Sequence, residues 1–126
     1  MVMIVRAFPV LQDRLNELRA FVKEMGDDRR TQAGEFYTSY GIQRESWHLQ
    51  ETPSGPLIVG VTELDENRMM DSVAQYAKSQ GEFDVWFKSQ VKLVTGIDPA
   101  IQPLGPPTEC IFEWIGERPD RQQAGF

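Results

Sequence analysis

The spacing of apolar residues changes along the chain from strand-like to helical and back, and these changes divide it into elements. Residues 3–10 are short, rich in β-branched and aromatic side chains and closed by a proline, which predicts a strand. Apolar residues then recur at steps of three and four, as on the buried stripe of a helix. Gly26 and the charged run at 27–30 interrupt this stripe, so we expect one broken helix or two stacked helices that end at Gly41. The stripe consists of Leu11, Leu15, Leu18, Val22, Met25, Ala33, Phe36, Tyr37 and Tyr40.

Two strands are predicted next, on either side of a turn that contains proline and glycine. Residues 42–52 and 56–63 flank the sequence TPSGP, which favours a short chain reversal. The second strand contains PLIVGV and is apolar on both faces, which is typical of a strand that is covered from both sides. A two-layer domain leaves one face of its sheet exposed to water, so we expect something to cover that face.

A second helical region and a last strand complete the pattern. Helical spacing starts near Asp65, restarts after 79–82, where Ser79 and Glu82 have the spacing of a capping box, and ends at Gly96. Its apolar positions are Met69, Met70, Val73, Ala74, Ala77, Phe83, Trp86, Phe87, Val91 and Val94. A proline-punctuated loop then leads to residues 109–115, ECIFEWI, which alternate as a strand does. Residues 117–126 have no pattern, and we expect a flexible tail.

The predicted order is β-α-β-β-α-β, which is that of a ferredoxin-like α+β sandwich formed by residues 1–116. Right-handed crossovers place both helical regions on one face of a four-stranded antiparallel sheet. The apolar PLIVGV strand indicates that the open face is not in contact with water, and the simplest cover is the same face of a second copy. We therefore expect a homodimer that forms through the open face of the sheet.

Composition and charge exclude several classes of function. The formal net charge is −6 and the basic residues do not cluster, which argues against binding to nucleic acid or an anionic membrane. The single cysteine, Cys110, cannot form an internal disulfide, which fits the reducing cytoplasm. No apolar run approaches the roughly 20 residues of a membrane span, and the first residues lack the basic region of a signal peptide. We expect a soluble cytoplasmic domain.

Two segments carry a resemblance to a known group. GIQRESWHLQET at 41–52 and FDVWFKSQ at 83–90 resemble a strand and a helix of an uncharacterised bacterial family in the dimeric α+β barrel superfamily. That superfamily includes the antibiotic-biosynthesis monooxygenases and the stress-responsive barrel proteins. The resemblance extends over most of residues 3–116 and implies a ferredoxin-like domain that dimerises. It implies no single activity, because the superfamily includes oxygenases, isomerases, haem enzymes and proteins without known chemistry.

The only histidine, His48, is the first candidate for chemistry. Strand alternation places Ile42, Arg44, Ser46, His48 and Gln50 on one face and Gln43, Glu45, Trp47 and Leu49 on the face that packs on the helices. His48 or Arg44 could polarise a substrate, since imidazole titrates near neutral pH. The alternative is a hydrogen-bonded histidine at the dimer interface. We favour this alternative, because a general base also needs a positioned partner.

Metal and haem sites are not expected. Zinc sites draw on several histidine and cysteine ligands, whereas this chain has one of each, far apart in sequence. So far as the resemblance goes, the haem-binding members of the superfamily use a histidine on a helix, and His48 lies on a predicted strand. The carboxylates of Glu63, Asp65 and Glu66 lack the spacing of a calcium loop and are better explained as a helix start. We therefore expect no cofactor and no metal.

Aromatic residues on the predicted helices are the candidates for a ligand pocket. They are Tyr37, Tyr40, Trp86 and Phe87, whose rings could line a space between helices and sheet. Ordinary core packing is the commoner role of such positions. Two functions stay open: binding of a small apolar or aromatic molecule, which we favour, and a cofactor-independent monooxygenase or isomerase that acts on an electron-rich aromatic. A cavity reached by His48, Arg44 or Tyr40 would favour the enzyme.

Overall fold

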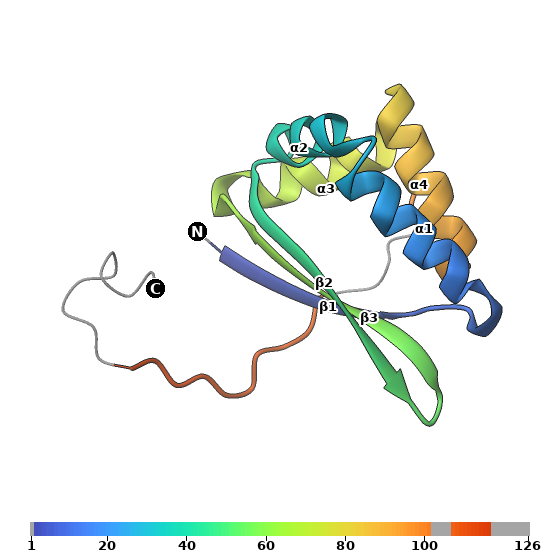
Figure 1. The fold of residues 1–126 in the computed structure, drawn as a ribbon. Helices are drawn as coiled ribbons and strands as arrows, with labels where there is room; N and C mark the ends of the chain where they lie inside the picture. Colours follow the sequence, from blue (N-terminus) through green and yellow to red (C-terminus); the bar gives the residue numbers. More distant parts are fainter. Residues whose placement is uncertain (1, 102–106, 117–126) are drawn as a thin grey trace.

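The computed structural model describes residues 2–101 and 107–116 and has an α+β fold, as shown in Figure 1. Its strands are β1 (Val2–Pro9), β2 (Ile42–Thr52) and β3 (Gly55–Leu64). Its helices are α1 (Leu15–Gly26), α2 (Arg30–Ser39), α3 (Met69–Lys78) and α4 (Glu82–Thr95). Two short 3-10 turns, Gln12–Arg14 and Glu66–Arg68, precede α1 and α3. The helices gather on one face of the sheet, which makes a two-layer molecule (Figure 1).

The sheet that the structure describes has three antiparallel strands in the order β1-β3-β2. Strands β1 and β2 therefore run parallel to each other, with α1 and α2 in the crossover between them. Strands β2 and β3 form the predicted hairpin, whose turn is closed by a 2.6 Å hydrogen bond from Thr52 Oγ1 to the Gly55 carbonyl. Gly55 has φ 116°, a value that only glycine adopts readily. The α+β class and the hairpin predicted from the sequence are confirmed.

The predicted last strand, 109–115, does not join this sheet among the described residues. Residues 107–116 form no ladder, and Figure 1 shows them leaving the body and extending away from it. Thr108 makes the contact with β1: its backbone N and its Oγ1 both donate to the Val5 carbonyl at 2.8 Å. The alternation at 109–115 predicts an extended backbone, but a strand also needs an adjacent edge. The predicted tail, 117–126, lies outside the described residues.

The long helical stripe is divided into α1 and α2, as one of the two expected arrangements. Its inner face differs from the prediction at two positions: Leu11 lies before α1 and is 41% exposed, and Phe21 takes the inner position predicted for Val22. Phe21 is 1% exposed, whereas the predicted stripe member Val22 is 43% exposed. Both residues lie within one turn of the buried Leu18, so spacing alone does not choose between them. The larger aromatic ring takes the inner position, because it buries more apolar surface there.

The core lies between the helices and the facing side of the sheet, in two adjoining clusters. One contains Phe21, Ala33, Phe36, Tyr40, Phe83, Phe87 and Val91. The other contains Phe8, Val10, Leu18, Ile58 and Val94. Trp47 packs against both clusters from β2. The rings meet mainly edge-on or tilted, such as Phe21 and Phe87 with centroids 5.4 Å apart, which is a favourable geometry for aromatic pairs.

The sheet face opposite the helices, here called the outer face, is mostly apolar along β1 and β3 and polar along β2, which contributes Arg44, Ser46, His48 and Gln50. The register places Val5, Val61 and Ser46 in one row across it, and Ala7, Val59 and His48 in the next. Met3 and Leu57 belong to the same face, and Met3 is 59% exposed. Strand β3 thus has apolar side chains on both faces, as its sequence predicts. In the single chain, the described residues leave this face open.

Candidate ligand cavity

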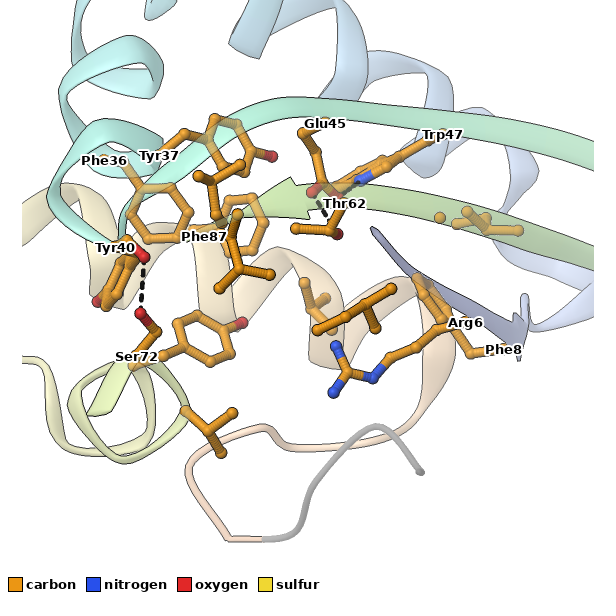
Figure 2. A pocket seen from close by; sticks show the side chains of 18 of the residues that line it. Arg6, Phe8, Phe36, Tyr37, Tyr40, Glu45, Trp47, Thr62, Ser72 and Phe87 are labelled. Carbon is orange, nitrogen blue, oxygen red and sulfur yellow. Dashed lines mark hydrogen bonds between the residues drawn. The ribbon is translucent and has the colours of Figure 1, made fainter. Parts of the chain in front are cut away.

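A cavity of about 180 Å³ lies between the inner face of the sheet and the helices, and Figure 2 shows its side chains at close range. The lining residues come from all three strands and from each of the four helices. They are Ile4, Arg6, Phe8, Phe21, Phe36, Tyr37, Tyr40, Ile42, Glu45, Trp47, Ile58, Gly60, Thr62, Leu64, Ser72, Val73, Tyr76, Phe87, Val91, Val94 and Thr95. Most are aliphatic or aromatic, with a few polar groups among them, which is the usual make-up of a small-molecule site.

The cavity has a local cause in the sequence, which is Gly60 in the middle of β3. In the register, Gly60 stands between Arg6 of β1 and Trp47 of β2, and it has no side chain to fill the space above it. A Cβ atom placed there would lie 3.9 Å from both Phe8 Cε1 and Trp47 Cδ1, which is an ordinary contact. Gly60 has no positive φ, so its backbone does not require glycine. The missing side chain therefore opens space rather than easing a turn.

Glu45 supplies a carboxylate to the cavity from β2. It accepts hydrogen bonds from Thr62 Oγ1 at 2.6 Å and from Trp47 Nε1 at 2.7 Å, both visible in Figure 2. Burial raises the pKa of the Glu45 carboxyl, while these two bonds and the charge of Arg6 oppose the shift. Arg6 lines the same cavity from β1. An acid whose pKa is perturbed by burial, held in an apolar cavity with a cation nearby, is a common feature of functional sites.

Three tyrosines, Tyr37, Tyr40 and Tyr76, line the cavity from the helical side. The Tyr40 hydroxyl donates to Asp84 Oδ2 at 2.5 Å, and burial together with this bond raises the pKa of Tyr40 to about 12. Among the described residues, the Tyr37 hydroxyl donates to the weak acceptor Met25 Sδ, at 3.9 Å. The Tyr76 hydroxyl is buried and has no hydrogen-bond partner in the part of the chain that the structure describes. Burial raises the pKa of Tyr37 and of Tyr76 well above the ordinary value, so both stay neutral donors near pH 7.

A buried lysine, Lys88, binds the end of the helix that carries Tyr76. Lys88 of α4 is 7% exposed, and its Nζ donates to the carbonyls of Tyr76, Ala77 and Ser79 at 2.9, 3.4 and 2.8 Å. These carbonyls belong to the last turn of α3 and the residue after it, where helix carbonyls lack partners within the helix. The ammonium group also fits the negative end of the helix dipole. Lys88 therefore fixes the end of α3 from which the Tyr76 ring projects.

The structure places some of the predicted site residues at the cavity and others away from it. Tyr37, Tyr40 and Phe87 line the cavity. Trp86 is not among the lining residues: it packs on Phe21 with ring centroids 5.3 Å apart, and the Arg29 guanidinium lies 4.2 Å from its ring centre. Three of the four residues predicted to line a pocket therefore do so.

His48 and Arg44 lie on the outer face, with the sheet between them and the cavity. Both are exposed, and His48 Nε2 lies 3.1 Å from Ser46 Oγ on the same strand face. Ile42, predicted to share their face, instead lines the cavity. The reason is an irregularity between Ile42 and Arg44, where the pairing with β3 shifts by one residue and turns Ile42 inward.

Sequence reasoning missed Arg6, Gly60 and Tyr76 as site residues. Arg6 alternates with the buried Ile4 and Phe8, so its inward position follows from strand periodicity. Tyr76 lies three residues after Val73 and was available to helical spacing in the same way. Gly60 gave no signal as a cavity residue, because an apolar strand pattern does not distinguish an empty position from a filled one.

Comparisons with protein-family models, with curated proteins and with solved structures give no match to this chain. Within residues 2–101 and 107–116, no group of three or more His, Cys, Asp or Glu side chains is placed to hold a metal ion. Among the same residues, none of the helices has the length and apolar character needed to cross a membrane.

Proposed function

We propose that this protein binds a small aromatic molecule with a single ring and one hydroxyl or carbonyl group in the cavity between sheet and helices. The volume supports one ring, because an engineered apolar cavity of about 150 Å³ binds benzene and this one measures about 180 Å³. The apolar lining supplies most of the affinity, and the polar groups orient the ligand.

The observation that carries the proposal is the buried Tyr76 hydroxyl without a partner in the described residues. A buried donor left unpaired costs stability, so a ligand oxygen that accepts its hydrogen bond has an advantage over a plain hydrocarbon. The Glu45 carboxylate is an acceptor in the same cavity, and a ligand hydroxyl can donate to it. A phenol combines both functions in one group, since its oxygen accepts while its hydrogen is donated.

The test compares phenol with toluene, which has nearly the same shape but no polar group. We expect phenol at millimolar concentration to raise the melting temperature by several degrees and toluene to raise it less, because a ligand stabilises the folded state that binds it. Isothermal titration would give the two affinities. No stabilisation by either compound, or equal affinity for both, would contradict the proposal.

A cavity-filling variant makes the test specific. In Gly60→Val the added methyl groups enter the cavity and should abolish phenol binding, while the β-branched residue suits a strand. Gly60→Ala adds only a Cβ with 3.9 Å contacts and should retain part of the affinity. A Gly60→Val protein that folds and still binds phenol would show that the ligand sits elsewhere.

A second candidate is the cofactor-independent monooxygenase or isomerase acting on an electron-rich aromatic. Two observations favour it: Tyr40 lines the cavity, and Glu45 is a carboxyl in the same cavity whose pKa is raised by burial, so it can serve as a proton donor or acceptor. Oxygen uptake with a hydroquinone, measured above the rate in buffer, is the assay. Glu45→Gln should then lose turnover while it keeps the substrate affinity. Activity that is unchanged in Glu45→Gln would remove Glu45 from the mechanism.

We further infer that the domain is a ferredoxin-like member of the dimeric α+β barrels and forms a cytoplasmic homodimer through the outer face. The order β1-β3-β2 agrees with three strands of the ferredoxin-like sheet, and the apolar rows of the outer face support burial against a second copy. The free thiol of Cys110 agrees with a reducing compartment. Light scattering should give twice the 14.4 kDa chain mass at micromolar concentration. A monomer would contradict the dimer and leave the ligand proposal intact.

A further inference from the structure

Residues 108–115, here called the C-terminal segment, expose four large apolar side chains. Ile111, Phe112, Trp114 and Ile115 are 87, 82, 78 and 66% exposed in the single chain. Figure 1 shows this segment, in orange-red, extending away from the sheet and the helices. Soluble proteins seldom leave such a contiguous apolar stretch in water, and where they do it usually marks an interaction site. The segment therefore requires a surface to cover it.

The free edge of β1 determines where the segment starts. Alternate residues of an antiparallel strand direct their N–H and C=O groups to opposite neighbours. The Val10 N–H donates to the Pro56 carbonyl at 3.0 Å, so the backbone N–H and C=O groups of even-numbered β1 residues point toward β3. The backbone groups of odd-numbered residues such as Val5 point away from β3, and the Val5 carbonyl accepts the bond from Thr108 at this free edge. The segment begins as a neighbour of β1.

The contact with β1 covers only the start of the segment in the single chain. Thr108 donates both of its hydrogen bonds to the Val5 carbonyl, and residues 108–115 form no ladder with β1. The four apolar side chains that follow remain 66–87% exposed. Among the described residues, the single chain therefore leaves them without a cover.

A second copy of the chain offers the missing surface. Its outer face carries the apolar Val5, Val59 and Val61, and this face is open in the single chain. The same face carries the exposed Arg44, whose charge is opposite to that of Glu109 and Glu113 in the segment. Each chain thus has an exposed apolar segment and an open apolar surface on its outer face. In a dimer with two-fold symmetry, the segment of each chain can cover the outer face of the other, and no unpaired surface of this kind remains.

We propose that residues 108–115 of each chain cross to a second copy and pack against its outer face, so that the two subunits exchange their C-terminal segments. This proposal rests on the homodimer inferred above and adds which residues form it. It is independent of the ligand. The dimer would bury the apolar residues of the segment and protect the Cys110 thiol, which is exposed in the single chain.

The first test uses charge substitutions in the full-length chain. Phe112→Asp and Trp114→Asp together should convert the dimer to a monomer of 14.4 kDa by light scattering. Both side chains are exposed in the single chain, so the fold should survive, which circular dichroism checks. Ile101→Asp is the matched control, because Ile101 is 81% exposed but lies outside the segment, and it should remain a dimer. A dimer that persists in the double variant overturns the exchange but leaves dimerisation through the outer face standing.

The second test asks which chain the segment touches. A tagged chain with the native Cys110 is refolded with an untagged chain that carries Cys110→Ser and Val61→Cys, and a short bismaleimide is added. Exchange predicts a cross-linked species containing one chain of each kind. Ser89→Cys in place of Val61→Cys is the control, because Ser89 lies on α4 and is exposed on the helical side. A dimer without this hybrid species, or a monomer whose Cys110 is protected from thiol reagents, would overturn the proposal.

Discussion

Replacing Tyr76 by phenylalanine should make the ligand-free protein more stable, which is the opposite of what most core substitutions do. The substitution removes the hydroxyl and keeps the ring, which packs on Phe36 and Phe87 with centroids 6.1 Å from each. A buried polar group without a partner costs roughly 1–3 kcal/mol, so its removal should raise the free energy of unfolding by about 1 kcal/mol or more. For a domain of this size, 1 kcal/mol corresponds to a rise of roughly 3–5 °C in melting temperature.

The control is Tyr40→Phe, which makes the same chemical change at a hydroxyl that has a partner. It loses the 2.5 Å hydrogen bond to the Asp84 carboxylate, and hydrogen bonds to charged groups contribute about 1.5–3 kcal/mol. We therefore expect Tyr40→Phe to be destabilised while Tyr76→Phe is stabilised. Urea unfolding followed by tryptophan fluorescence, at one fixed protein concentration, measures both differences.

Phenol binding should reverse the order of stability between the parent and Tyr76→Phe. Phenol can accept a hydrogen bond from Tyr76 only in the parent, so the parent should gain more stability from phenol than Tyr76→Phe does. If Tyr76→Phe is instead less stable than the parent by about 1 kcal/mol without ligand, the hydroxyl has a partner in solution. The Tyr76 hydroxyl would then give a ligand with an acceptor no advantage over a plain hydrocarbon.

Three further predictions concern Glu45, His48 and Lys88. Burial raises the folded-state pKa of Glu45 above its ordinary 4.5. The free energy of unfolding of the parent should therefore fall relative to that of Glu45→Gln as pH rises from 4.5 through the raised pKa, and then level off. Urea unfolding at several pH values measures this difference, and parallel pH profiles would contradict it. If the proposed homodimer forms through the outer face, His48→Ala should weaken it by ~1–3 kcal/mol in sedimentation without changing phenol affinity. An intact dimer that no longer binds phenol would make His48 functional. Lys88→Met should leave the carbonyls at the end of α3 without their hydrogen-bond donor, which should lower the melting temperature and weaken phenol binding. Calorimetry that shows neither effect would refute this role of Lys88.

Much of the secondary structure could be predicted from the sequence, because apolar spacing and turn residues act locally. The TPSGP turn, the β2–β3 hairpin and the ends of α2 and α4 near Gly41 and Gly96 follow from residues that are adjacent in the chain. Alternation also placed Glu45 and Trp47 together on the face toward the helices, where the structure has them. These features need no information from distant parts of the chain.

Tertiary structure decided the site. Helical spacing allowed Phe21 or Val22 inside, and only packing against Trp86 and Phe87 selected the ring. Gly60 opens a cavity only because larger residues of two other strands flank it. The alternation at 109–115 is plain in the sequence, but a strand forms only where it pairs with an edge, and among the described residues this segment forms no ladder. Local pattern determines backbone shape and facing, whereas a cavity or a strand pairing depends on residues that folding brings together from distant segments.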